Sequence, residues 1–375
     1  MEQDIILEIR GVSKEFPGVQ ALDNVSVSFR RGEVHALLGE NGAGKSTLIK
    51  ILTGAQPPTS GTLVIDGREY HALTPHQARQ LGIAAIYQEF NLIPSLDVSE
   101  NIFFGRELRK GPLRNRKLMD EQTKQYCRDM GIELNPRTLV KDLGVAYQQI
   151  VEIVKAVSVN ARILIMDEPS APLTNREVEA MFRIIRRLKE SGVTIIYISH
   201  RLEELFEVCD RVTILRDGKY ILTEDIKNLT RERMIASMVG RELGESYPEP
   251  TDHSPEVVLE VRDMTNERLR GVSFKLHKGE ILGIGGLVGA GRTELVRALF
   301  GADPVSKGEV IRNGQKIRIQ SPGQAIAHRI GLLPEDRKQA GLILGMNIRQ
   351  NISYSILKKL SRLSWLNNRK EKELS

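Results

Sequence analysis

The chain is poor in cysteine and in long apolar runs, and both absences exclude whole classes of protein. Only two cysteines occur in 375 residues, Cys127 and Cys209. Because neither a disulfide framework nor a metal-ligand spacing can be built from this pair, the composition favours a reducing compartment. No apolar run approaches the roughly 20 residues that a bilayer crossing needs. Residues 1–4 also lack the basic start of a signal peptide. We expect a soluble or peripheral protein.

Positive charge is concentrated in two short stretches, residues 106–117 and 357–375. Their combined excess is larger than the net charge of +6 for the whole chain, so the remainder is acidic. Apart from Trp365, neither stretch contains aromatic residues on which bases could stack. We therefore expect a solvated loop and a solvated tail, and no nucleic-acid partner. Contact with anionic lipid or an acidic partner is the alternative.

The most informative stretch is a glycine-rich loop between an apolar strand, residues 34–38, and a helix, residues 47–52. The loop reads Gly39-Glu40-Asn41-Gly42-Ala43-Gly44-Lys45-Ser46-Thr47. Such glycines let successive backbone N–H groups point at phosphate oxygens. Lys45 is placed to neutralise the β- and γ-phosphates, and the Ser46 hydroxyl is placed to ligate Mg²⁺. The N-terminus of the helix beginning near Lys45 adds partial positive charge, so every residue of the loop is a candidate for nucleotide binding.

Two more buried strands are expected downstream, at residues 162–166 and 193–198. The helix between them has apolar side chains at helical spacing, at Val178, Met181, Phe182, Ile185 and Leu188. This order predicts a βαβ unit with parallel strands. In such sheets ligands gather at the carboxyl ends of the strands, where the glycine-rich loop also lies.

Polar residues follow both strands at that edge. Asp167 suits the Mg²⁺ shell, and Glu168 suits polarising the attacking water. His200, after the second strand, can hydrogen-bond the γ-phosphate, and Gln88 can reach both metal and water from a loop. Taken singly, each residue could be structural. Their order behind a phosphate-binding loop favours nucleotide hydrolysis.

The chain also repeats its own pattern. Four glycines and a proline recur 247 positions later, as Gly32 and Gly279, Gly44 and Gly291, Gly61 and Gly308, Gly67 and Gly314, and Pro75 and Pro322. The repeat predicts a first domain over residues 4–240, an acidic, proline-containing linker over 241–256, and a second domain over 257–375. The second copy has about half the length of the first. Its own loop adds nucleotide-binding candidates, namely Gly289, Gly291, Arg292 and Thr293.

On these residues the whole chain resembles ABC-type ATPase subunits, and more narrowly the fused double-ATPase subunits of bacterial monosaccharide importers. Besides the loop, the resemblance rests on residues 14–22, 87–94, 167–169, 197–201, 289–294 and 335–342. It implies an α/β fold of the P-loop NTPase ABC type, with a mixed, largely parallel sheet and a helical subdomain. The fold would be tandemly repeated with the second copy incomplete. The resemblance also implies ATP and Mg²⁺ as cofactors and hydrolysis that energises import of a monosaccharide.

The same resemblance implies partners and two further roles. The partners would be integral membrane permease subunits and, indirectly, an extracytoplasmic sugar-binding protein. The chain would be peripheral, at the cytoplasmic face of the cell membrane. Phe16 would stack on adenine, with packing of its strand to the core as the alternative. Gln88 would mark the loop that touches the permease.

Three positions depart from what the family leads us to expect. The signature loop is usually Leu-Ser-x-Gly but here reads Leu143-Gly144-Val145-Ala146; Pro172 stands where a small residue is expected; and Arg292 replaces the lysine of the second loop. Since ABC domains pair head to tail, the altered signature would face the altered second loop. We therefore expect one hydrolytic composite site, one degenerate site, and weak activity of this chain alone.

Two other functions remain open at this stage. One is a soluble tandem ABC ATPase acting on ribosomes or nucleic acid, which the short acidic linker disfavours. The other is a regulatory module that holds ATP without turnover.

Overall fold

The computed structural model describes residues 4–88, 90–240, 253–287, 289–335, 340–362 and 365–375. Three predicted features lie partly outside these residues. They are the linker 241–256, the motif 87–94 at Glu89, and the motif 335–342 at residues 336–339. The chain divides into two compact units, Met1–Tyr247 and Pro248–Ser375.

A six-stranded sheet forms the centre of the first unit. Its strand order is β12-β11-β3-β10-β9-β6. The strands are β3 (Val34–Leu38), β6 (Ile83–Ile86), β9 (Ile163–Asp167), β10 (Thr194–Ile198), β11 (Arg211–Arg216) and β12 (Lys219–Asp225). All neighbours are parallel except β11 and β12. The βαβ prediction is confirmed. Because both faces of the sheet are covered, β3 and β10 are buried along their whole length and β9 is buried up to Asp167.

One face of this sheet packs against α1 (Lys45–Leu52) and a four-stranded antiparallel sheet of order β2-β1-β4-β5. Those strands are β1 (Ile5–Phe16), β2 (Val19–Arg30), β4 (Ser60–Ile65) and β5 (Arg68–Tyr70). The short helix α2 (Pro75–Gln80) follows, with a capping box at Thr74. The two sheets and α1 enclose one hydrophobic core.

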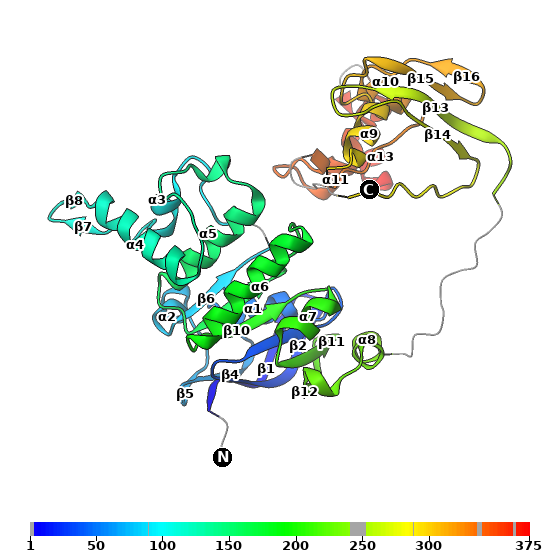
Figure 1. The fold of residues 1–375 in the computed structure, drawn as a ribbon. Coiled ribbons are helices and arrows are strands. Elements are labelled where there is room, and N and C mark those ends of the chain that lie inside the picture. The colour runs from blue at the N-terminus through cyan, green and yellow to red at the C-terminus, as the bar shows by residue number, and fades with distance from the viewer. Residues whose placement is uncertain (1–3, 89, 241–252, 288, 336–339, 363–364) are drawn as a thin grey trace. The chain divides into compact units, whose positions relative to one another are not determined.

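Helices cover the other face and enclose a second, larger core. They are α3 (Val98–Ile102), α4 (Arg116–Asp129), α5 (Val145–Val157), α6 (Asn175–Glu190), α7 (Leu202–Val208) and α8 (Arg231–Val239). The predicted apolar stripe of α6 is buried. Figure 1 shows α3, α4 and α5 gathered at one end of this unit with the hairpin of β7 (Arg109–Lys110) and β8 (Leu113–Arg114). Most of the basic stretch 106–117 is exposed as expected, although Arg106 is half-buried and bonds Ile102 and Ser158. It forms this hairpin and the start of α4 instead of a plain loop.

The second unit is built on an antiparallel sheet of order β14-β13-β15-β16. Its strands are β13 (Val257–Thr265), β14 (Val272–His277), β15 (Lys307–Arg312) and β16 (Gln315–Ile317). The helix α9 (Arg292–Leu299) packs on this sheet through Leu295 and Ala298. The helix α10 (Pro322–Ala327) follows β16 and is capped by Ser321.

The described residues of 357–375 are largely exposed, as a solvated stretch predicts, but they form short helices and strands instead of a plain tail. This stretch contains α12 (Leu357–Leu360), the strands β17 (Ser361–Arg362) and β18 (Trp365–Leu366), and α13 (Asn368–Leu374). The Ser353 hydroxyl, on α11 (Ile348–Tyr354), donates to buried Glu371 at 2.6 Å, so α13 is held against α11. Across the parts of the chain that the structure describes, no helix combines the length and apolarity that a membrane crossing demands.

Candidate nucleotide-binding and catalytic site

The loop after β3 has a shape that only glycine permits at two positions. Gly44 has φ of 97°, in the left-handed region, and a Cβ there would lie 2.6 Å from the carbonyl oxygen of Ala21. A Cβ on Gly39 would lie 2.3 Å from the carbonyl oxygen of Leu215. The loop is therefore pressed between the backbones of β2 and β11, and it opens α1 with Gly44 as the N-cap.

The Lys45 side chain lies across the inside of this loop. Its ammonium donates to the carbonyl oxygens of Gly39 at 2.6 Å and Glu40 at 3.0 Å. Burial lowers the pKa of Lys45, while the charges of Glu168 and Asp167 act to raise it. Lys45 thus lies within electrostatic reach of both carboxylates, which follow β9.

The next residues divide between the surface and the core. Ser46 is exposed at the N-terminus of α1 and Thr47 is half-buried, while Ala43 is buried and packs beneath the loop. Asn41 and Gly42 are exposed at its tip. Backbone N–H groups and the Ser46 hydroxyl are thus available to a phosphate and its cation.

Glu168 is the point at which the other predicted residues meet. The Gln88 amide donates to Glu168 Oε2 at 3.2 Å, and His200 Nδ1 lies 3.3 Å from Glu168 Oε1. Burial raises the pKa of the neighbouring Asp167 carboxyl, and the charge of Glu168 raises it further. The structure therefore brings together Lys45, Gln88, Asp167, Glu168 and His200, from four separate segments.

The backbone at Glu168 is unusual for its residue type. Its φ is 49°, in the left-handed region that non-glycine residues rarely adopt. Its N–H donates to the carbonyl oxygen of Ile198 at 2.9 Å, which ties the end of β9 to the end of β10. Such strain persists where the surrounding structure holds it in place, and it concentrates at functional sites.

The helix α5 holds the loop after Gln88 in place. We did not predict this contact from the sequence. Glu152 Oε1 accepts from the N–H of Asn91 at 3.0 Å, and the Lys155 ammonium donates to the Asn91 carbonyl oxygen at 2.8 Å. Glu152 is buried, and that burial raises the pKa of its carboxyl. Movement of α5 would therefore also move the loop that follows Gln88.

Phe16 ends β1, at the tip of the β1–β2 hairpin. Its side chain is 38% exposed and lies outside the hydrophobic cores, and the Lys14 ammonium is 5.2 Å from its ring centroid. These contacts do not support the alternative in which Phe16 packs its strand to the core. The ring is available to stack on a planar ligand.

The altered signature loop begins α5. Gly144 is the N-cap of this helix and supplies no side-chain hydrogen bond, while Val145 and Tyr147 are exposed. A Cβ built on Gly144 meets nothing within 4 Å. A serine would therefore fit at this position without displacing its neighbours.

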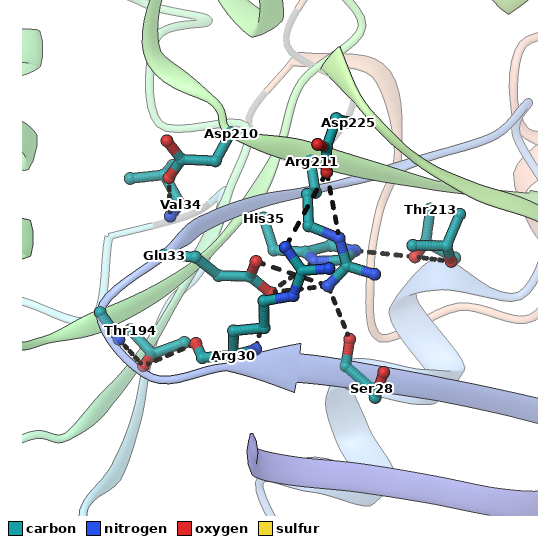
Figure 2. A network of polar contacts seen from close by, with 12 residues as sticks. Ser28, Arg30, Glu33, Val34, His35, Thr194, Asp210, Arg211, Thr213 and Asp225 are labelled. Atoms are coloured by element: carbon teal, nitrogen blue, oxygen red, sulfur yellow. Dashed lines mark hydrogen bonds and ion pairs between the residues drawn. The ribbon is translucent and has the colours of Figure 1, made fainter. Parts of the chain in front are cut away.

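The other end of β3 is fixed by a buried polar network (Figure 2). His35 Nδ1 lies 2.9 Å from Glu33 Oε1, and His35 Nε2 lies 2.7 Å from the Thr213 hydroxyl. Because an ionised carboxylate only accepts, Nδ1 donates to Glu33 and Nε2 accepts from Thr213. Arg211 lies 3.4 Å from the same Glu33 oxygen. Burial lowers the pKa of His35, so the ring stays neutral while it links β3 to β11.

The second loop reproduces the turn of the first but not its chemistry. Gly289 and Gly291 have φ of 82° and 91°, and Gly291 is the N-cap of α9. Arg292 and Thr293 are exposed, and Glu294 pairs with Arg268 at 2.8 Å. In this loop an anionic side chain already occupies the first turn of the helix.

One group that the sequence reasoning missed lies directly behind Glu168 and His200. Glu204 is buried and accepts hydrogen bonds from Ser170, Tyr197 and Ser199. Its position four residues after His200, in the first turn of a helix, was the only sequence signal that could have drawn attention to it.

Comparison with known proteins gives a consistent result. The family model described as ABC transporter matches residues 22–171 and 269–375. The chain is 48% identical to the ribose import ATP-binding protein RbsA 3 of Rubrobacter xylanophilus, covering 99% of this chain and 74% of that protein. It is 47% identical to the putative ribose/galactose/methyl galactoside import ATP-binding protein 1 of Agrobacterium fabrum, covering 96% of this chain and 72% of that protein.

A solved structure shares the fold. The ADP conformation of MJ1267, an ATP-binding cassette of an ABC transporter, is 25% identical with a TM-score of 0.57. The match covers 63% of this chain and 99% of that one. The predicted fold, a P-loop NTPase of the ABC type, is thereby confirmed.

Proposed function

The chain belongs to the ABC transporter family of ATP-binding subunits, and on that premise we propose that it hydrolyses Mg-ATP to energise import of a monosaccharide through a membrane permease. The observation that carries the proposal is the meeting of Gln88 and His200 on the Glu168 carboxylate, within electrostatic reach of Lys45. The names of the related proteins support ribose or galactose as the class of sugar. They support neither a ribosome- or nucleic-acid-acting ATPase nor a module without turnover.

Each residue has a distinct task in this proposal. The loop amides of residues 39–47 and the Lys45 ammonium bind the β- and γ-phosphates, and Phe16 stacks on the adenine. Glu168 accepts a hydrogen bond from the attacking water and draws the proton of that water toward the carboxylate. His200 contacts the γ-phosphate and holds Glu168 in place.

The metal site fits the residues that are present. Mg²⁺ would be held by the Ser46 hydroxyl, the Gln88 amide oxygen and the Asp167 carboxylate, a set of oxygen ligands that suits this ion. When bound, the ion neutralises charge on the phosphate oxygens. Burial and the charge of Glu168 raise the pKa of Asp167, and a bound cation would act in the opposite direction, in favour of the ionised carboxylate.

The domains and partners follow the same proposal. Residues 4–240 act as a first ABC ATPase domain, residues 241–256 as a linker, and residues 257–375 as part of a second. The chain sits at the cytoplasmic face of the cell membrane through permease subunits, which an extracytoplasmic sugar-binding protein supplies with sugar. ATPase domains pair head to tail, so Leu143-Gly144-Val145-Ala146 faces a nucleotide on the opposing domain.

When two copies of this chain pair through their first domains, each Lys45 loop faces the other copy's altered signature, and this predicts slow turnover by this chain alone. Gly144 lacks the hydroxyl that would bond the opposing γ-phosphate, and loss of one hydrogen bond to a charged group costs about 1.5–3 kcal/mol. We expect Gly144→Ser with Ala146→Gly to raise steady-state phosphate release at least tenfold at saturating ATP. Gly144→Ser also adds an N-cap to α5, so Gly144→Asn serves as the control that caps the helix without that hydroxyl.

A separate experiment tests the import step. The native complex should co-purify from membranes with a multi-span permease, and its ATPase activity should rise when a ribose- or galactose-loaded binding protein is added. Purification without any membrane partner would overturn the transport proposal while leaving ATP hydrolysis standing.

A further inference from the structure

Glu204 is a buried carboxylate whose hydrogen-bond partners converge on a single oxygen. The side chain comes from the first turn of α7, and the residue is 5% exposed. Its Oε2 accepts from the hydroxyls of Ser170 at 2.7 Å, Tyr197 at 2.8 Å and Ser199 at 2.8 Å. A buried charge is retained only where such bonds replace its hydration, so these three hydroxyls are tightly constrained.

Two of the three hydroxyls lie on the loops that carry Glu168 and His200, and the third lies inside a strand. Ser170 stands two residues after Glu168, and Ser199 immediately precedes His200. Tyr197 lies inside β10 and is part of the sheet itself. One oxygen atom therefore joins the loop after β9, the loop after β10 and the strand that carries the second loop.

The remaining contacts of Glu204 act on one of these loops. Arg201 lies 3.5 Å from Glu204 Oε1, and the N–H of Arg201 donates to the Ser199 hydroxyl at 3.0 Å. The Glu204 N–H also donates to the Arg201 carbonyl oxygen at 3.1 Å. The turn that contains His200 is thus closed around the Ser199–Glu204 bond.

The contact between Glu168 and His200 depends on where these two loops lie relative to each other. It spans 3.3 Å and joins an exposed imidazole to a carboxylate on a strained, left-handed backbone. A small shift of either loop would break it, because the contact is already long and the His200 side chain is 64% exposed. The Ser170–Glu204–Ser199 arrangement fixes both loops at their roots.

We propose that Glu204 is a positioning residue that sets the distance between Glu168 and His200 by holding Ser170 and Ser199 on one carboxylate oxygen. The inference rests on the proposed ATPase function and concerns how that site is kept assembled. Glu204 is buried, and its carboxylate contacts Ser170, Tyr197, Ser199 and Arg201. Its effect reaches the reaction through the two loops.

The test deletes one hydroxyl at a time. Ser170→Ala and Ser199→Ala each free one loop, whereas Tyr197→Phe removes an equally buried hydroxyl from the same oxygen without freeing either. Burial, and then the charge of Glu204, raise the pKa of the Tyr197 hydroxyl, so it too acts as a donor. We expect each serine variant to lower kcat by about fivefold to twentyfold while the Kd for Mg-ATP stays within twofold. Tyr197→Phe should leave kcat within twofold of the unmodified chain.

Thermal unfolding of the three variants supplies the second measurement. A merely structural role predicts similar losses of stability in all three and unchanged kcat at equal folded fraction, and that result would overturn the inference. Ser170→Thr keeps the hydroxyl and should recover most of the kcat lost in Ser170→Ala. Absence of turnover in the unmodified chain, with Mg-ATP bound, would instead overturn the ATPase proposal and this inference with it.

Discussion

The two copies of the repeat share a loop and differ in the segment that leads to it. In the first unit β3 is buried between β10 and β11. At the equivalent positions of the second unit, the described residues 280–287 form no strand, and Ile281 is 98% exposed. Gly44 and Gly291 nevertheless adopt the same turn, with φ of 97° and 91°. A turn is specified by its own residues, whereas a central parallel strand needs neighbours that lie far along the chain.

A second pair of equivalent residues supports this lesson. The Asn101 side-chain amide donates to three backbone carbonyl oxygens, at sequence separations of 8, 5 and 4 residues. Asn351 does the same at the same three separations. All of these contacts are local, and both copies keep them.

The largest expected effect lies in the first unit, at the proposed catalytic carboxylate, Glu168. We expect Glu168→Gln to reduce ATP turnover about a thousandfold, roughly 4 kcal/mol in barrier, because an amide cannot accept the proton of the attacking water. Mg-ATP affinity should be retained. Phosphate release and equilibrium binding, measured on the same sample, separate the two effects; turnover at the unmodified rate would remove Glu168 from this role.

The next largest expected effect is a difference in stability, because the segment before the loop is buried in the first unit and more exposed in the second. Leu37 is 1% exposed, and Ile284, at the equivalent position, is 42% exposed. Leu37→Ala should lower the free energy of unfolding by about 2–5 kcal/mol, because it opens a cavity in a packed core. Ile284→Ala should cost less than about 1 kcal/mol. Urea denaturation followed by circular dichroism measures both, and equal losses would contradict the difference in burial.

The two loops should also differ in their contribution to nucleotide binding. Lys45→Ala removes the cation on the β- and γ-phosphates and should weaken Mg-ATP binding at least tenfold, about 1.4 kcal/mol. Arg292→Ala should change the affinity less than threefold, since Glu294 already places a negative charge in that helix turn. Titration with a fluorescent ATP analogue compares the variants. A larger effect of Arg292→Ala would move the main binding site to the second unit.

The smallest effect concerns pH. His35 is buried in the first unit, whereas the equivalent position of the second unit holds Leu282. Because burial lowers the pKa of His35 in the folded chain, the unfolded chain takes up a proton first as the pH falls. Stability should therefore decrease below about pH 6.5, by at most about 1.4 kcal/mol per pH unit. Urea denaturation at pH 7.5, 6.5 and 5.5 tests this, and His35→Gln should show a shallower dependence.

Much of the first unit could be predicted because its signals are local. The apolar runs of β3, β9 and β10, the stripe of α6 and the glycines of the loop each reflect contacts made within a short stretch. The order of strands also placed Glu168 and His200 at one edge, where the structure brings them into contact.

Other features depend on contacts with residues that lie far away in the sequence, and no local pattern predicts them. The buried carboxylates Glu152 and Glu204 resemble exposed helix residues until the loops that they hold are known. The His35–Glu33–Thr213 network joins residues up to 178 positions apart. The charged segment that forms α13 resembles a solvated tail, because its polar contacts with α11 run through Glu371, which bonds Ser353 and pairs with Arg349.

The left-handed backbone of Glu168 lowers the stability of the fold at the residue that we propose for ATP hydrolysis. Glycine adopts this conformation without steric penalty, so replacing Glu168 with glycine would relieve about 1 kcal/mol of strain while deleting the carboxylate that the reaction needs. A search for thermostable variants that ignored turnover would therefore be drawn to this position. With its proposed role, the glutamate at this position stabilises the reaction at a cost to the fold.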